Sequence, residues 1–167
     1  MDEKAKQTAL RMIPYGLYVL TAESENGSVA AATVNWVTQA SFEPPLVVVG
    51  VKMGSGTHAV IKKCGAFAIN ILGKDQADIA PKFFKHVERE GDTVAGVPFE
   101  SGSTGSPLLQ GCPGYIECSL VLTLEKGDHS IFIGEVVDAG VAEEPEGRPD
   151  ALTLTLADLQ GDMFYGG

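Results

Sequence analysis

The alternation of apolar and polar residues along the chain predicts a mainly β protein. The clearest strand covers residues 115–124, where apolar positions such as Ile116 and Leu120 alternate with polar ones. Further strands are predicted over residues 17–21, 28–35, 46–51, 67–71, 130–138 and 152–156. The dipeptide Asn26-Gly27 lies between the first two, and it favours a tight hairpin turn that needs positive φ.

Only short helices interrupt this β pattern. They are predicted over residues 2–12, after the start at Ser55, and over residues 75–84, with an interruption at Pro81. Residues 91–114 are rich in Gly, Ser and Pro and predict one long loop, a kind of connection that is often functional. Many antiparallel strands with short helices favour a β-barrel, and 167 residues suit a single domain over residues 1–167.

The composition bears on the cellular compartment of the protein and on whether it binds metal or a membrane. Its three cysteines cannot all pair within one chain, and no CxxC or CxxH spacing predicts a metal site. The longest apolar run, residues 46–51, is too short to cross a bilayer, and the N-terminal residues lack the core of a signal peptide. We therefore expect a cytoplasmic protein with no membrane partner and no metal.

The charge is uneven along the chain. The net charge is −10, which argues against general binding of nucleic acid, because phosphate neutralisation needs a basic face. Residues 52–89 nevertheless carry seven basic and three acidic side chains, whereas residues 90–167 carry two and fourteen. A small anion site is therefore expected in the basic segment, although solvated lysines on helix faces would give the same pattern.

A phosphate site is the first chemical candidate. Lys52 follows a buried strand, and Ser55, Thr57 and His58 stand at the start of a predicted helix. The first N–H groups of a helix have no intrahelical partner and favour an anion. Local sequence alone favours the commoner arrangement, an ordinary helix cap by Ser55 or Thr57 with Lys52 in solvent. No GxGxxG or GxxxxGK[ST] motif supports a dinucleotide fold or a P-loop.

Two further segments carry candidate chemistry. Residues 33–41 offer hydroxyls, amides and the only tryptophan, which suit a flat heterocycle or form a plain polar loop. The candidates there are Thr33, Asn35, Trp36, Val37, Thr38, Gln39 and Ser41. His129 follows Asp128 in a predicted turn, where the carboxylate could fix the histidine tautomer, or where His129 is simply exposed.

Several stretches occur in an order that resembles the flavin reductase-like, FMN-binding split-barrel family. They are residues 31–51, 55–58, 67–72, 105–108, 117–118 and 127–136. The resemblance runs from about Pro14 to Val137, and Asn35-Trp-Val-Thr-Gln39 is similar to the branch of flavin modules that partner rubredoxin or flavodiiron proteins.

The resemblance implies a six-stranded, Greek-key-like split barrel that forms a homodimer and binds FMN rather than FAD near the subunit interface. By position, Thr33 to Ser41 would line the isoalloxazine and ribityl chain. Lys52, Ser55, Thr57 and His58 would surround the phosphate. Phe83 or Phe84 would lie near the flavin edge, and His129 would orient the nicotinamide as the catalytic side chain.

The implied function is an FMN-dependent oxidoreductase that transfers a hydride from NAD(P)H to flavin and passes electrons onward. A tightly FMN-bound electron-transfer module that partners rubredoxin or a flavodiiron protein is the alternative. A third reading is a non-redox barrel with a vestigial pocket, which would not need polar donors in both candidate regions.

Overall fold

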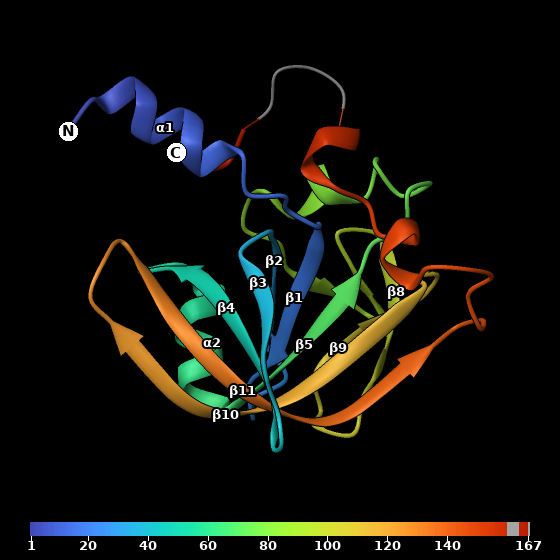
Figure 1. Cartoon of the computed structure of the whole chain (residues 1–167). Coiled ribbons are helices and arrows are strands. Elements are labelled where there is room, and N and C mark those ends of the chain that lie inside the picture. The colour runs from blue at the N-terminus through green and yellow to red at the C-terminus, as the bar shows by residue number, and fades with distance from the viewer. Residues whose placement is uncertain (160–163, 167) are drawn as a thin grey trace.

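The protein is described by a computed structural model that covers residues 1–159 and 164–166 (Figure 1). The helices are α1 (Glu3–Arg11) and α2 (Gly56–Cys64), with 3₁₀ turns η1 (Ala80–Phe83), η2 (Pro149–Leu152) and η3 (Leu156–Asp158). The strands are β1 (Tyr18–Glu23), β2 (Val29–Val34), β3 (Val37–Phe42), β4 (Pro45–Lys52), β5 (Ala66–Ile71), β6 (Arg89–Glu90), β7 (Thr93–Val94), β8 (Val97–Ser101), β9 (Pro107–Leu109), β10 (Gly114–Glu125) and β11 (His129–Val141). The prediction of a mainly β fold with short helices is confirmed.

The main sheet curls into a barrel because of its strand order. The order is β2-β1-β5-β10-β11-β4-β3, and neighbouring strands pair antiparallel. β2 and β3 are the two edge strands, yet only Asn35 and Trp36 separate them in the sequence. The two edges must therefore come together, and Trp36 O accepts a hydrogen bond from Gly50 N on β4 at 2.9 Å. The sheet has seven strands where six were expected, because Val37–Phe42 pairs with β4.

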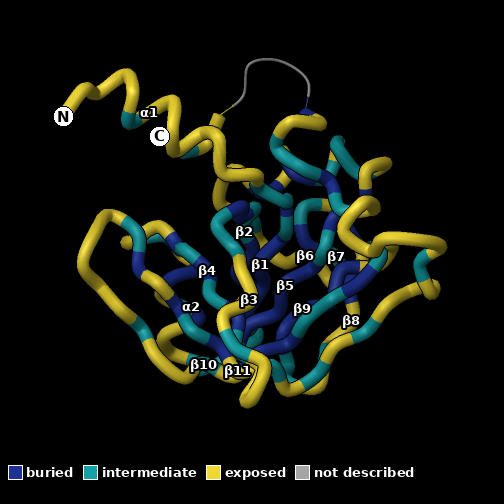
Figure 2. Tube along the Cα trace, in the orientation of Figure 1, coloured by how far each residue is buried: buried dark blue, intermediate teal, exposed yellow. Residues whose placement is uncertain are grey.

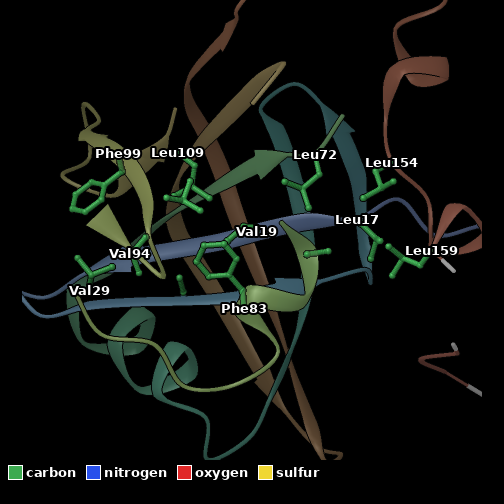
Figure 3. Packing of buried hydrophobic residues seen from close by; sticks show 13 residues of the cluster. Leu17, Val19, Val29, Leu72, Phe83, Val94, Phe99, Leu109, Leu154 and Leu159 are labelled. Atoms are coloured by element: carbon green, nitrogen blue, oxygen red, sulfur yellow. The ribbon is translucent and has the colours of Figure 1, made fainter. Parts of the chain in front are cut away.

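Two apolar clusters stabilise the two sides of this sheet. Inside the barrel, buried Val49, Phe67 and Phe132 pack with Ile61 of α2. On the other side, Figure 3 shows a second cluster that joins β1 to η1, to the smaller sheet and to the C-terminal segment. Leu17 and Phe83 belong to this second cluster and also line the cleft described below.

Residues 91–114 are not the predicted loop. They contain β7, β8 and β9, which together with β6 form a second sheet in the order β6-β7-β8-β9. These strands are two to five residues long and include Pro98 and Pro107, so they are too short to show an alternating pattern.

Buried Glu117 of β10 holds the β8–β9 connection against the main sheet. Its carboxylate accepts hydrogen bonds from the backbone N–H and the hydroxyl of both Ser103 and Thr104, at 2.6–3.0 Å. Burial by itself raises the pKa of Glu117, but these hydrogen bonds outweigh burial and lower that pKa below its ordinary value. The smaller sheet is thus anchored by a buried charge as well as by apolar packing.

Two other predicted elements differ from the structure. The helix predicted over residues 75–84 is reduced to η1, because Pro81 lacks an N–H and stands at the start of this turn. The strand predicted over residues 152–156 is only a pair of isolated bridges, Gly16 to Thr155 and Gly73 to Thr153. The hairpin at Asn26-Gly27 is confirmed, and Gly27 has a φ of +80°.

The predicted helix at residues 2–12 is confirmed as α1, which Asp2 caps. Figure 2 shows that α1 is almost wholly exposed, and none of its residues is buried. Within the described part of the chain, the helices are too short and too polar to span a membrane.

Candidate functional site

A cleft of about 470 Å³ opens where the two edges of the curled sheet approach each other. This volume lies in the range of about 300–1,000 Å³ that is usual for small-molecule sites. Its walls come from β2, the end of β4, the start of α2, η1 and the C-terminal segment. Residues that were predicted as site residues and line it are Thr33, Asn35, Lys52, Ser55 and His129, and Phe83 and Phe84 line it as well.

One end of the cleft has the character of an anion site. Ser55 caps α2 and accepts the N–H of His58 at 3.2 Å, and the first turn of α2 carries no acidic residue. The N–H groups of Gly56 and Thr57, the first two of the helix, have no hydrogen-bond partner among the described residues. Lys52 forms no ion pair with a carboxylate of the described residues, so its ammonium is available to a ligand.

Thr57 and His58 lie beside this end but do not line the cleft. Both are buried. The His58 imidazole is directed into the barrel, where Nε2 lies 2.8 Å from Ser130 Oγ and 3.6 Å from Glu125 Oε1. The ring also packs against Phe132, with 5.1 Å between the ring centroids. His58 therefore ties α2 to the β10–β11 hairpin, and a phosphate contact from its side chain stays a prediction.

An aromatic and amide cluster lies beside the anion site, because His129 is the cross-strand partner of Lys52. His129 Nδ1 lies 3.0 Å from Asp128 Oδ1, and Nε2 lies 2.7 Å from the hydroxyl of Tyr165. The Trp36 ring packs against both His129 and Tyr165, with centroid distances of 4.6 Å and 5.4 Å. The bond to His129 lowers the pKa of the Asp128 carboxyl, so this group is a carboxylate near neutral pH.

Trp36 packs tightly against β4 beneath this cluster. A Cβ at Gly50 would lie 3.0 Å from Trp36 Cε3, so glycine allows the indole to pack on the strand. Among the described residues, the indole Nε1 is buried and has no hydrogen-bond partner. A buried donor without a partner is unfavourable, and a ligand carbonyl in the cleft would relieve it.

The rest of the candidate segment extends away from the cleft. Thr38 and Gln39 are exposed on edge strand β3, whereas Val37 and Ser41 are partly buried there. The Gln39 amide donates to Ser41 O at 3.2 Å. These four residues do not line the cleft of a single chain, and their predicted contact with flavin remains untested.

Sequence reasoning missed two aromatic residues of the cleft. Phe164 and Tyr165 follow the last bridge of the fold and return to β2, where Asn35 Nδ2 donates to Tyr165 O at 3.0 Å. The guanidinium of Arg11 lies 4.5 Å from the centre of the Phe164 ring. No local pattern signals these contacts, which join residues 130 or more positions apart.

The comparisons with known proteins agree with this geometry. A family described as "Flavin reductase like domain" matches residues 10–165. The chain belongs to the flavin reductase-like domain family. The resemblance in the sequence is thereby confirmed, and several relatives of the chain are named flavin reductases.

Three relatives and one solved structure illustrate the membership. This flavin reductase-like domain is 33% identical over 135 residues to a "Probable flavin reductase" of Rhizobium meliloti, covering 81% of this chain but only 42% of that protein. It is 32% identical to the "NADH-dependent flavin reductase StyB" of Pseudomonas fluorescens, covering 89% of this chain and 85% of StyB. It is 35% identical to a "High molecular weight rubredoxin" of Moorella thermoacetica, covering 87% and 62%.

The solved structure is the styrene monooxygenase flavin reductase of Pseudomonas putida S12. It superposes with a TM-score of 0.70 at 34% identity, covering 82% of this chain and 86% of that one. The split-barrel fold class predicted from the sequence is confirmed by this similarity.

Proposed function

We propose that the protein is an FMN-dependent oxidoreductase that accepts a hydride from NAD(P)H and passes electrons to a further acceptor. The observation that carries this proposal is the arrangement of the cleft. Lys52, Ser55 and the start of α2 lie in its wall next to His129, the cross-strand partner of Lys52, while Asn35 also lines the cleft and Trp36 packs against His129.

The donors of the cleft fit FMN. A phosphate monoester suits the free N–H groups of α2 and the ammonium of Lys52. The amide of Asn35, which lines the cleft, suits a carbonyl of a flat heterocycle. FMN ends at its single phosphate, which matches a helix start that closes one end of the cleft, and this favours FMN over FAD.

When bound, flavin supplies the hydride-accepting and electron-transferring chemistry. The protein binds the flavin, orients the nicotinamide and shields the cleft with apolar side chains. Phe83, which is buried, and Phe84, which is half-exposed, present apolar surface to the cleft. His129 is held by Asp128 and by packing on Trp36, and it is the side chain that orients the nicotinamide. These residues need not exchange protons with the substrate, because the transferred group is a hydride.

Anaerobic mixing of the FMN-loaded protein with NADH tests this proposal. Stoichiometric loss of the visible flavin absorption is expected. Full retention of that absorption in the presence of excess NADH and NADPH would contradict the oxidoreductase proposal.

A second candidate is a tightly FMN-bound module that exchanges electrons with rubredoxin or a flavodiiron protein. Similarity to the rubredoxin-named protein of Moorella thermoacetica favours it. Reduction by reduced rubredoxin in stopped flow, at a rate well above reduction by NADH, would support this candidate over the first.

We also propose a cytoplasmic homodimer. The three thiols are free, which suits a reducing compartment. The β10–β11 hairpin exposes Val121, Leu122, Leu124, Val137 and Val141, which are each at least half exposed. Exposed apolar side chains on one hairpin suit a protein interface. Light scattering coupled to size exclusion should give twice the mass of the 17.5 kDa chain, and the monomer mass would contradict the dimer.

A further inference from the structure

Tyr165 fills the part of the cleft that faces His129. Its hydroxyl lies 2.7 Å from His129 Nε2, and its ring packs 5.4 Å from Trp36. Its carbonyl accepts the Asn35 amide at 3.0 Å. Tyr165 thus contacts His129 and Trp36 through its side chain and Asn35 through its backbone carbonyl, and these three residues would receive a nicotinamide or a flavin ring.

The direction of the Tyr165–His129 hydrogen bond follows from Asp128. The Asp128 carboxylate only accepts hydrogen bonds, so the neutral imidazole carries its proton on Nδ1. Nε2 is then an acceptor, and the Tyr165 hydroxyl donates to it. Burial and the nearby charge of Asp128 raise the pKa of Tyr165, so the phenol keeps this proton at neutral pH.

The contacts of Tyr165 are incomplete in a way that suits displacement. Tyr165 packs on Trp36, yet the indole Nε1 has no hydrogen-bond partner among the described residues. Tyr165 is about half exposed, and neighbouring Phe164 is held by the exposed guanidinium of Arg11. A ligand with a donor for His129 and an acceptor for Trp36 would satisfy more polar groups than Tyr165 does.

The carboxamide of NAD(P)H has both of these groups. Its NH₂ donates as the Tyr165 hydroxyl does, and its carbonyl is an acceptor. Resting on the proposed function, we infer that Tyr165 is an internal competitor of the nicotinamide. It occupies His129 Nε2 until the carboxamide takes that position, and it thereby sets the affinity for the dinucleotide. Tyr165 is in this sense a specificity-determining residue rather than a catalytic one.

Calorimetric titration of the FMN-loaded full chain with NAD⁺ tests the inference without turnover. Y165F keeps the ring but removes the donor to His129. It should bind NAD⁺ about two- to tenfold more tightly, the range expected for one net hydrogen bond. Y165A, which also clears the ring from the cleft, should bind at least as tightly as Y165F. Y115F is the matched control because Tyr115 lies on β10 and does not line the cleft, and it should bind as the parent does.

Two further measurements separate competition from a structural role. The KM for NADH should fall in Y165F while kcat and the FMN dissociation constant stay unchanged. In an H129A background, Y165F should have no effect on NAD⁺ binding, because the bond it removes is already absent.

Equal or weaker NAD⁺ binding by Y165F, including no measurable binding by either protein, would overturn the inference. If NADH still reduces the flavin of the parent protein in that case, only the role of Tyr165 fails and the proposed function stands. If NADH does not reduce that flavin, the proposed function fails as well.

Discussion

Replacing Lys52 by Gln tests the phosphate site that we propose at the start of α2. The ammonium lies in the cleft wall beside the start of α2 and has no carboxylate partner among the described residues. The substitution removes a positive charge and keeps a polar side chain of similar length. Its effect should therefore fall on the phosphate and not on the flavin ring.

The magnitude follows from the exposure of Lys52. Two unit charges about 4 Å apart interact by roughly 1–4 kcal/mol between the dielectric of water and that of a protein surface. Because Lys52 is exposed, the lower part of that range applies, about 1–2 kcal/mol. FMN affinity should fall by about 5- to 30-fold. Raising the ionic strength should narrow the gap between parent and variant.

The assay is fluorescence titration of the flavin-free protein with FMN and, separately, with riboflavin, which lacks the phosphate. K63Q is the matched control, because Lys63 lies in the last turn of α2 and loses the same charge away from the cleft. K52Q should bind riboflavin as the parent does, and K63Q should bind both ligands normally. An equal loss of FMN and riboflavin affinity in K52Q, or no loss of either, would refute the assignment of the phosphate site.

The remaining predictions concern catalysis and stability. H129A should lower kcat/KM for NADH on the order of 10- to 100-fold in steady-state kinetics, because the nicotinamide loses its orienting side chain, and unchanged kinetics would contradict this. E117A should lower the free energy of unfolding in urea by about 2–4 kcal/mol. In the parent, the stability that Glu117 contributes is present above the ordinary carboxyl pKa and is lost as the pH falls through its lowered pKa. If the free energy of unfolding of E117A fell with pH as that of the parent does, the stabilising role of Glu117 would be contradicted. G134A should cost about 1–3 kcal/mol in the same urea assay, because its Cβ would lie 2.5 Å from Phe67 Cζ, and parent-like stability would refute this overpacking.

The sequence was informative where structure depends on neighbouring residues. Strand β10 follows from the alternation over residues 115–124, although register shifts after Glu117 and Leu120 interrupt it in the structure. The turn at Gly27 follows from its need for positive φ. The Ser55 cap of α2 and the position of Lys52 follow from a strand that runs into a helix start. These local features underlie the proposed phosphate site.

The parts that the sequence did not reveal depend on contacts between distant segments. The strands of the smaller sheet pair with one another, and the β8–β9 connection is held by Glu117. These strands are too short to show an alternating hydrophobic pattern. The return of Tyr165 to Asn35 joins residues 130 positions apart, so no local motif predicts it. The direction of the His58 ring likewise depends on a contact with Ser130, which lies on β11 and is distant from His58 in the sequence.

A crystal structure of the FMN-loaded protein would show directly whether flavin binds in this cleft. We expect the phosphate within hydrogen-bond distance of the N–H groups at the start of α2 and beside Lys52, with the ring extending toward Asn35. Flavin bound outside this cleft, or a phosphate directed away from α2, would contradict it.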